Sequence, residues 1–529
     1  MIPPSAQDQD DAERPADSAA GSSPASATDA PRRLTRRTVL GLGAAAAAVT
    51  AAGIIVPRLF ANARIVAPTD PAVAATEQAR HHTGRFVTRS LRAEPVVLDL
   101  GGREVRSWAY GGRLPGAPIR VGVGDELRVN LSSDLPAPTT IHWHGLALRN
   151  DMDGVPGLTT PQVEAGQVFE YAFTVPHPGT YWFHPHVGVQ LDTGLYGALI
   201  VDDPNEPGAY DDEAVVVLDD WTDGWGESPD QLLERARRDG MGGMHGMGGM
   251  GGMGMGMPSV EQPLGPDTGE VRYPAHLING RLPAAPYAIT TSPGRRVRLR
   301  IINAGSDTAY RFAIGGHRLT VTHADGFPVE PVDVETLIIG MGERYDVVVT
   351  AGNGVFPIVA IPEGKPDPAA QALLRTSSGA GPADTRPAEL GGRLLAYRDL
   401  IASPRAALAT RKPDRQLKMT LTVADGGRRW LINGRSYDDH EPLPVNAGER
   451  VRLVITNQSM MFHPMHLHGH TFALVRPDGR GIRKDTVNVL PTQQLAVDLD
   501  ADNPGQWLTH CHNVYHMELG MMTTLSYRT

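Results

Sequence analysis

The sequence predicts an all-β protein of three β-sandwich domains, and three observations support this fold class. The chain has 529 residues, which is too long for a single hydrophobic core. It contains 59 glycines and 44 prolines, a composition that favours short strands joined by turns over long helices. One pattern of turn and strand also occurs three times, at intervals of domain size. We therefore expect each copy to mark one β-sandwich.

Each copy of this pattern contains Gly-Arg, a turn glycine and a run of alternating apolar and charged residues, which is typical of a half-buried strand. The copies are YGGRLPGAPIRVGVGDELRV, INGRLPAAPYAITTSPGRRVRLRI and INGRSYDDHEPLPVNAGERVRLVI, which begin at Tyr110, Ile278 and Ile432. Their turn glycines are Gly124, Gly294 and Gly448, which lie 170 and 154 residues apart. This spacing predicts domains over residues 64–208, 209–400 and 401–529.

Residues 1–63 are predicted to form a disordered polar segment followed by a twin-arginine signal peptide. Arg36 and Arg37 precede an apolar run over residues 39–56 and the small-residue stretch Ala61-Asn62-Ala63. The run is long enough to remain as a membrane anchor, but its alanine and glycine content favours cleavage. We expect export to the periplasm, the cell envelope or the medium, with no membrane span in the mature protein.

Four His-x-His pairs stand at matched positions of the first and third predicted domains. They are His142/His144, His184/His186, His466/His468 and His510/His512. Side chains two residues apart lie on the same face of a strand, so each pair projects two imidazoles in one direction. At the equivalent offsets of 18 and 20 residues after the turn glycine, the middle domain has Phe312 and Ile314. A lone pair is more often a surface or core feature, but four matched pairs predict a metal cluster between the outer domains.

Cys511 is the only cysteine of the chain, so an exported protein cannot use it for an internal disulfide. It stands between the two histidines of the last pair, and strand alternation therefore points it to the opposite face. His463 shares this parity. With His516 and Met521, these residues offer a thiolate, two imidazoles and a thioether, the ligands of a blue-copper electron-transfer centre. The corresponding residues of the first domain are Pro185, Gln190 and Leu195.

The stretches HWHG, HPH, HPMHLHG and HCHNVYHMELGM resemble the four copper motifs of the three-domain multicopper oxidases, over roughly residues 84–529. The resemblance implies cupredoxin-like Greek-key domains, four copper ions, and reduction of O2 to water with electrons taken up singly at type 1 copper. By this resemblance, type 1 copper is bound by His463, Cys511, His516 and Met521, and type 2 copper by His142 and His466. The type 3 pair is bound by His144, His184 and His512 on one ion, and by His186, His468 and His510 on the other.

Asp153 and Glu518 are the predicted proton donors near this cluster. Asp153 lies in DMDGVPG shortly after HWHG, where related enzymes have an acid that feeds protons to oxygen; a structural role in a turn is the alternative. Several relatives carry glutamate directly after the last type 1 histidine, but this chain has Met517 there and Glu518 next. With the electron carrier Cys511, these two acids complete the predicted catalytic residues.

The segment MGGMHGMGGMGGMGMGM, residues 241–257, is predicted to be a loop that binds Cu(I). Its glycine spacing cannot pack a core, and thioethers are soft ligands that select Cu(I). The predicted ligands are Met241, Met244, His245, Met247, Met250, Met253, Met255 and Met257, together with Met461 next to the type 1 motif. A neutral low-complexity insertion is the alternative.

Three functions remain open at this point. The first is an exported cuprous oxidase of copper tolerance, since HCHNVYHMELGM is most similar to the copper-resistance branch of the family. The second is a laccase acting on phenols or aromatic amines, and the third is a copper-sequestering protein without turnover. We expect a monomer whose partners are O2 and either Cu(I) or a small phenolic donor. The net charge of −10, from 49 basic and 59 acidic residues, argues against nucleic-acid binding.

Overall fold

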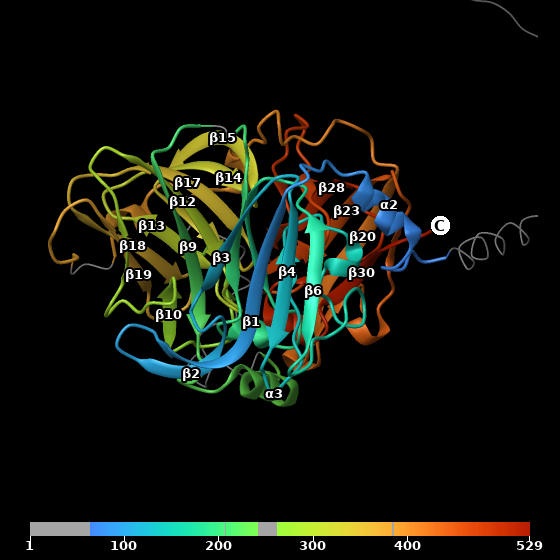
Figure 1. The fold of residues 1–529 in the computed structure, drawn as a ribbon, viewed down its shortest axis with the longest axis horizontal. Coiled ribbons are helices and arrows are strands. Elements are labelled where there is room, and N and C mark those ends of the chain that lie inside the picture. The colour runs from blue at the N-terminus through green and yellow to red at the C-terminus, as the bar shows by residue number, and fades with distance from the viewer. Residues whose placement is uncertain (1–63, 207, 242–261, 383–385) are drawn as a thin grey trace, which may run out of the picture. The chain divides into compact units, whose positions relative to one another are not determined.

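The computed structural model describes residues 64–206, 208–241, 262–382 and 386–529. The predicted disordered segment and signal peptide, residues 1–63, lie outside the described residues. In the described part of the chain, no helix is both long and apolar enough to cross a membrane. The strands form six sheets, two in each of three successive stretches of the chain (Figure 1).

The first two sheets have the strand orders β2-β1-β4-β6 and β3-β8-β7-β5. Their strands are β1 (Phe86–Asp99), β2 (Glu104–Tyr110), β3 (Gly116–Gly122), β4 (Glu126–Ser133), β5 (His142–His144), β6 (Val168–Thr174), β7 (Gly179–His184) and β8 (Gly197–Asp202). Every second side chain of β4 is buried, and these residues pack with apolar residues of β3 and β8 from the other sheet. The alternation that the sequence showed after its first turn glycine thus builds the core of a sandwich.

The middle two sheets have the orders β10-β9-β12-β17-β14-β15 and β11-β19-β18-β13-β16. Their strands are β9 (Asp212–Trp221), β10 (Ala275–Ile278), β11 (Tyr287–Thr290), β12 (Arg296–Asn303), β13 (Tyr310–Ile314), β14 (Leu319–Ala324), β15 (Phe327–Val334), β16 (Thr336–Ile339), β17 (Arg344–Thr350), β18 (Val355–Pro362) and β19 (Ala370–Arg375). These strands carry the predicted core residues Phe312 and Ile314, and both side chains are fully buried.

The last two sheets have the orders β21-β20-β23-β28-β25-β26 and β22-β30-β29-β24-β27. Their strands are β20 (Arg415–Ala424), β21 (Arg429–Ile432), β22 (Leu443–Val445), β23 (Arg450–Asn457), β24 (His463–Leu467), β25 (Phe472–Leu474), β26 (Arg483–Lys484), β27 (Thr486–Val489), β28 (Gln494–Asp500), β29 (Gln506–Cys511) and β30 (Met522–Tyr527).

The three pairs of sheets repeat one topology. Each pair contains two parallel strand pairings between non-consecutive strands: β1 with β4 and β3 with β8, β9 with β12 and β11 with β19, and β20 with β23 and β22 with β30. No sheet of the described residues mixes strands from two of the stretches. The predicted all-β fold of three sandwiches is confirmed. The described residues nevertheless pack as one compact unit, so the exact domain limits stay a prediction.

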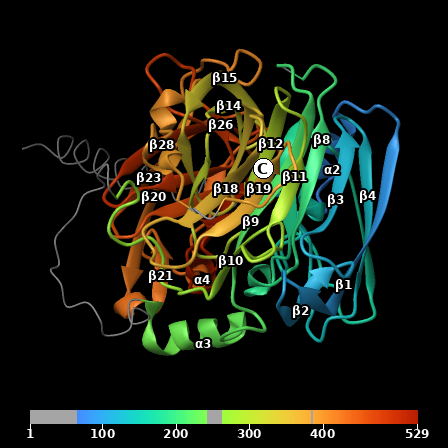
Figure 2. The same cartoon turned by 90° about the vertical axis from the view of Figure 1, so that its left-hand side faces the viewer.

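Short helices accompany the sheets, namely α2 (Pro71–Gln78), α3 (Pro229–Asp239), α4 (Val514–Glu518) and the 3-10 turn η1 (Asn150–Met152). Ser228 and Gln231 form a capping box at the start of α3. α3 lies beside α4 (Figure 2). The side chain of Asn513 accepts hydrogen bonds from the backbone N–H groups of Tyr515 and His516, so α4 begins at once after the last histidine pair. This turn sets the position of His516.

Candidate metal centre

Two matched strand pairs carry the histidines of the outer sandwiches. In the first sandwich β5 pairs antiparallel with β7, and His142 lies opposite His184. In the third sandwich β24 pairs antiparallel with β29, and His466 lies opposite His510. The register is the same in both, so the duplicated sequence motifs present their imidazoles at equivalent places.

The eight histidines converge into one buried cluster that joins the first and third sandwiches. The ring of His142 stacks on that of His468 with 3.7 Å between centroids, and His144 stacks on His466 at 3.8 Å. Each stacked pair contains one histidine from the first sandwich and one from the third. Four further rings have centroids 4.9–5.4 Å from a stacked ring: His184, His186, His510 and His512. The predicted cluster residues are therefore all brought together.

The spacing of the rings is compatible with shared metal ions. One predicted type 3 set has ring nitrogens within 4.8 Å of one another: His186, His468 and His510. The other predicted type 3 set has ring centroids 4.9–5.7 Å apart: His144, His184 and His512. The centroids of the predicted type 2 pair, His142 and His466, lie 5.7 Å apart.

Most of these histidines keep a ring nitrogen unpaired inside the cluster. Among the described residues, the buried ring atoms without a hydrogen-bond partner include Nε2 of His142, His184, His186 and His466, Nδ1 of His144, and both nitrogens of His512. The Nε2 atoms of His468 and His510 face each other at 3.1 Å. Buried polar atoms are costly to leave unpaired, and imidazole nitrogen is a good copper ligand. The donor set therefore fits a group of copper ions.

Burial favours the neutral form of three cluster histidines, His184, His186 and His510. It lowers the pKa of His184, His186 and His510 well below the usual value, and neighbouring histidines lower it further. The Nδ1 atom of His184 lies 2.8 Å from the carbonyl of Pro185, and that of His510 lies 2.9 Å from the carbonyl of Cys511. These contacts orient the rings and leave the lone pair of Nε2 available to a metal ion.

Asp153 lies at the cluster, as the sequence predicted. Its Oδ2 is 2.9 Å from Nδ1 of His468, and its Oδ1 is 3.2 Å from Nδ1 of His142. The residue ends η1 and is followed by Gly154, where a Cβ would overlap the carbonyl of Ile141. The tight turn of DMDGVPG thus aims a carboxylate at one histidine from each outer sandwich.

Asp485 occupies a similar place and was not recognised in the sequence. Its Oδ1 is 3.2 Å from Nε2 of His144 and 3.4 Å from Nδ1 of His466. Burial alone would raise the pKa of Asp485, but the guanidinium of Arg344 and hydrogen bonds from both histidines lower it well below the usual value. The sequence feature that could have indicated Asp485 is the charged pair Lys484-Asp485 directly before the buried strand β27, because buried charges require partners.

Cys511 and its predicted partners form a second site. Its Sγ lies 3.6 Å from Nδ1 of His463 and 3.7 Å from Nδ1 of His516, and all three side chains are fully buried. The backbone of Met521 bonds to that of Cys511 and of His516, at 3.1 and 2.9 Å, and its side chain is fully buried. Burial raises the pKa of the Cys511 thiol, an effect that a bound metal ion reverses.

Glu270 and Trp430 complete the surroundings of His516. The indole of Trp430 stacks on the imidazole with 3.7 Å between centroids, and Oε1 of Glu270 lies 3.2 Å from Nε2. Glu270 is almost fully buried, and its Oε2 has no hydrogen-bond partner among the described residues. No motif in the sequence pointed to Glu270, which lies 246 residues before His516.

The methionines of the predicted Cu(I) ligands fall into two groups. Met461 is buried, and its backbone forms a β-bridge with Asp267, close in sequence to Glu270. Met241 is fully buried in the hydrophobic core directly after α3, so it belongs to the packed protein and not to a loop. The remaining predicted ligands lie outside the described residues: Met244, His245, Met247, Met250, Met253, Met255 and Met257.

Glu518 lies beside an arginine, whereas a proton donor of the cluster would have to contact the cluster histidines. Its Oε2 lies 3.9 Å from Nη2 of Arg237 on α3. Burial raises the pKa of Glu518, and Arg237 partly offsets this. Asp485, and not Glu518, is the second acid that contacts the cluster histidines in the described structure.

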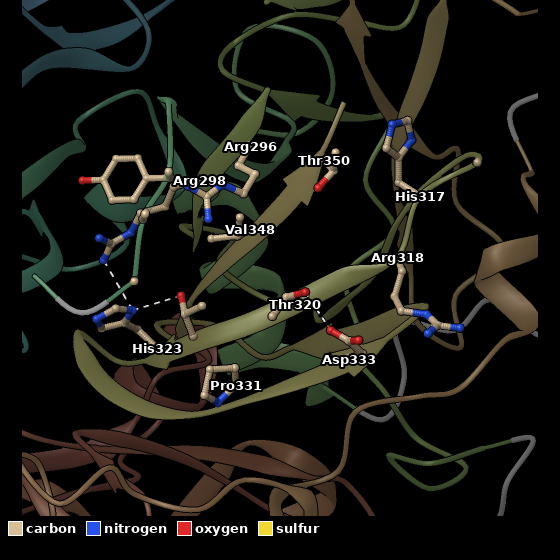
Figure 3. Close-up of a pocket in the computed structure, with 15 residues that line it drawn as sticks. Arg296, Arg298, His317, Arg318, Thr320, His323, Pro331, Asp333, Val348 and Thr350 are labelled. Carbon is tan, nitrogen blue, oxygen red and sulfur yellow. Dashed lines mark hydrogen bonds between the residues drawn. The ribbon is translucent and has the colours of Figure 1, made fainter. Parts of the chain in front are cut away.

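A cavity of about 500 Å³ lies in the middle sandwich, and none of the predicted copper ligands is among the described residues that line it (Figure 3). Arg298 in its wall pairs with Asp346 at 2.5 Å, and His323 lies 3.2 Å from Glu206. Because these charges are satisfied inside the protein, the cavity carries no functional assignment.

Comparison with known proteins agrees with this geometry. Three family models, each described as multicopper oxidase, match residues 94–206, 212–379 and 410–529. The chain is 48% identical over 498 residues to the multicopper oxidase MmcO of Mycobacterium tuberculosis, covering 94% of this chain and 97% of that protein. It is 28% identical to copper resistance protein A of Escherichia coli, covering 80% and 90%.

A solved structure has the same fold. The laccase from Botrytis aclada superposes with a TM-score of 0.70 at 25% identity, covering 86% of this chain and 90% of that one. The buried histidine cluster, the separate cysteine site and the three matching family models lead to one conclusion. The chain belongs to the multicopper oxidase family, whose members hold one type 1 copper, one type 2 copper and a type 3 pair.

Proposed function

We propose that this protein is a cuprous oxidase that serves copper tolerance. Bound copper ions would supply one-electron transfer from the donor at the type 1 site and the reduction of O2 by four electrons and four protons to two molecules of water. The observation that carries the choice of donor is the carboxylate of Glu270 at the ring of His516. A relative named copper resistance protein A supports a role in copper handling.

The surroundings of Glu270 carry an excess of negative charge. Burial and the carboxylates of Asp307 and Asp267 raise the pKa of Glu270 well above the usual value, and Lys365 lowers it. Lys365 is already bonded to Asp307 at 2.6 Å. A cation held at Glu270 would take the place of the proton that this raised pKa favours, whereas a neutral phenol offers no positive charge to the carboxylate. Cu(I) is such a cation, and the backbone of Met461, whose thioether is of the kind that prefers Cu(I), pairs with Asp267 close in sequence to Glu270.

Within this proposal, each copper ion has an assigned set of residues. Type 1 copper would be held by His463, Cys511, His516 and Met521, and type 2 copper by His142 and His466. The type 3 ions would be held by His144, His184 and His512, and by His186, His468 and His510. The unpaired buried ring nitrogens support the assignments at the histidine cluster. The contacts of Cys511 Sγ with His463 and His516 support those at type 1 copper.

Asp153 is the proposed source of protons for oxygen reduction. Its carboxylate reaches the Nδ1 atoms of His142 and His468. Among the described residues, no lysine or arginine forms an ion pair with Asp153, whose partners are the two histidines. Asp485 differs, because Arg344 holds it as an anion. Asp153 is therefore the carboxyl group better suited to exchange a proton.

A laccase acting on phenols is the second candidate. Glu270 could accept the proton of a phenol whose electron enters at His516, and laccases are among the relatives, for example laccase-4 of Thanatephorus cucumeris at 31% identity over 76% of this chain. A copper-sequestering protein is disfavoured, since storage does not require two separate sites that share β29.

Oxygen uptake by copper-loaded protein, with Cu(I) and with a phenol side by side, tests the choice of donor. We expect Glu270→Gln to lower Cu(I) oxidation at limiting copper by at least about tenfold, or about 1.4 kcal/mol, because the anionic partner of the cation is lost. Phenol oxidation should hold. The control is Glu206→Gln, which removes a carboxylate between β8 and β9 that contacts Arg298 and His323 of the middle sandwich instead. Equal loss of both activities in Glu270→Gln would favour the laccase.

Deletion of residues 242–257 tests the methionine-rich segment. The deletion spares Met241, which belongs to the core. We expect Cu(I) oxidation at low copper to fall and phenol oxidation to hold or rise, with an unchanged blue absorption as the folding control. Unchanged Cu(I) turnover with reduced phenol turnover would contradict the proposal.

Export by the twin-arginine pathway to the periplasm, the cell envelope or the medium is part of the same proposal. Replacing Arg36 and Arg37 by lysine should leave the protein inside the cell. Fractionation of cells that produce the two forms measures this, and export of the double variant at the normal rate would contradict it.

A further inference from the structure

Arg344 opens β17 of the middle sandwich and is fully buried, although this sandwich supplies none of the assigned copper ligands. Its guanidinium holds Asp485 with two hydrogen bonds, from Nη1 to Oδ1 at 2.7 Å and from Nη2 to Oδ2 at 2.6 Å. Its Nε donates to the backbone carbonyl of Thr180 at 3.1 Å. Thr180 lies on β7, the strand that carries His184. One side chain of the middle sandwich thus contacts both outer sandwiches.

Asp485 transmits this contact to the cluster. Its Oδ1 lies 3.2 Å from Nε2 of His144 and 3.4 Å from Nδ1 of His466, the two rings that stack on each other. The opposite nitrogens, Nδ1 of His144 and Nε2 of His466, are buried and have no hydrogen-bond partner among the described residues. Thr486 Oγ1 lies near the same two nitrogens, 3.2 Å from Nε2 of His144 and 3.1 Å from Nδ1 of His466, and the backbone carbonyl of Asp485 lies 2.9 Å from Nδ1 of His466. The carboxylate thus acts together with these groups to select which nitrogen each ring presents to a metal ion.

The surroundings hold the Arg344–Asp485 pair in one place. Asp325 accepts the backbone N–H of Arg344 at 2.9 Å and that of Asp485 at 3.2 Å. Lys484 is fully buried and lies 3.1 Å from Asp325. Gly145, the glycine of HWHG, packs against the pair: a Cβ at this position would collide with Nη2 of Arg344 and lie 2.7 Å from Oδ2 of Asp485. The first sandwich thus leaves room for an ion pair made by the other two.

The geometry points to Arg344 as a positioning residue of the trinuclear copper site, which fixes Asp485 and through it the rings of His144 and His466. This inference rests on the assignment of these two histidines as copper ligands. A planar guanidinium holds both oxygens of a carboxylate in one plane, whereas an ammonium group is a point charge that imposes no plane. The middle sandwich thereby contributes to copper binding without a ligand of its own.

Arg344→Lys tests the inference, because it keeps the positive charge and removes the planar fork. The matched control is Arg311→Lys. Arg311 also holds a carboxylate of the middle sandwich by two hydrogen bonds, to Glu363 at 2.7 and 2.8 Å, and among the described residues it does not pair with a cluster histidine. Titration of the metal-free proteins with copper gives the affinities, and the type 2 electron paramagnetic resonance (EPR) signal and blue absorption report the two sites separately.

We expect Arg344→Lys to bind the trinuclear copper ions about 10–100-fold more weakly, with an altered type 2 EPR signal and an unchanged blue absorption. Arg311→Lys should keep the affinity and both signals of the unchanged protein. Unchanged cluster affinity and EPR signal in Arg344→Lys would overturn the inference. If that variant also loses its blue absorption, Asp485→Asn decides in its place, since it keeps the size of the side chain; an unchanged cluster in Asp485→Asn would equally overturn it.

Gly145→Ala tests the same ion pair from the first sandwich. Its Cβ collides with the Arg344–Asp485 pair, so we expect a selective loss of cluster copper as in Arg344→Lys. Gly102→Ala is the control for backbone strain, because Gly102 has a similar φ of +94° against +90° but no neighbouring atom within 4 Å of the added Cβ. An equal effect of both substitutions on cluster copper would contradict the inference. Because copper affinity is measured without any electron donor, a failure of Cu(I) as the preferred donor leaves these results unaffected.

Discussion

The first and third sandwiches present the same strands with different chemistry. In both, a short histidine strand pairs with a second histidine strand in the same register, as β5 does with β7 and β24 with β29. On the opposite face the third sandwich has Cys511 with two imidazoles, whereas the first has Pro185 at the corresponding position. One copy of the scaffold therefore faces a single metal site, and the other copy faces two.

Gln190 and Leu195 show how the first sandwich fills the place of a type 1 site. The amide of Gln190 donates to the carbonyl of Pro138 and accepts from the hydroxyl of Thr139, both at 2.8 Å. Leu195 is fully buried. The shared backbone thus fixes the positions at which a ligand could lie, and the side chains at these positions determine whether they form a metal site or a packed core.

The largest expected effect is on the site that only the third sandwich has. Cys511→Ser should abolish the intense blue absorption, because the thiolate that produces it is gone, while the trinuclear ions stay bound. Absorption spectra and copper content measure this. Pro185→Ser, the same change at the equivalent position of the first sandwich, should leave the colour intact. A blue Cys511→Ser variant would remove the distinction between the two sandwiches.

Next in size is the loss of a ligand from either side of the shared cluster. His142→Ala and His466→Ala should have equal effects, because these residues are equivalent and each is proposed to hold type 2 copper. O2 reduction should fall to background in both, with the type 2 EPR signal lost and the blue absorption kept. Normal turnover in one of the two variants would show that the sandwiches do not share the site.

A smaller effect is expected for Asp153, the aspartate that is proposed to supply protons. Asp153→Asn should slow O2 reduction by about 100-fold, because the amide cannot deliver a proton, while type 1 copper is still reduced at the normal rate. Stopped-flow absorption and oxygen uptake measure the two steps. Asp151→Asn is the control, since Asp151 pairs with Arg149 in the same turn. Full activity in Asp153→Asn would leave this residue a structural role only.

The smallest expected effect concerns Gln190, which stands in the first sandwich at the position that corresponds to His516. Gln190→Leu should lower the free energy of unfolding by about 1–3 kcal/mol, because the carbonyl of Pro138 and the hydroxyl of Thr139 lose their partner. Copper content and colour should not change. Chemical denaturation of the metal-free protein measures the stability, and a loss of copper in this variant would mean that Gln190 belongs to the metal centre.

Most of the fold and the copper residues could be predicted from the sequence, because both depend on local rules. The three turn glycines and the alternation after them indicated three sandwiches, and strand parity placed Cys511 and His463 opposite the histidine pairs. In the structure Cys511 lies with His463 and His516, and the eight histidines form a separate cluster.

Two predicted site residues have surroundings that their local pattern did not indicate. The sequence indicated a single glycine- and methionine-rich segment that begins at Met241, but Met241 packs in the hydrophobic core directly after α3. Glu518 lies one residue beyond the position at which several relatives are expected to carry a glutamate. On α4 this shift places it next to Arg237 and not next to the histidines.

Asp485, Arg344 and Glu270 were decided by the tertiary structure alone. The Arg344–Asp485 pair joins residues 141 positions apart, and the contact between Glu270 and His516 spans 246 positions. Such contacts follow no periodicity, because they arise where separate sandwiches pack together and each buried charge must find its partner. The candidate ligands could therefore be predicted from sequence motifs and strand alternation, whereas the groups that orient these side chains and set their charge depend on how the three sandwiches meet.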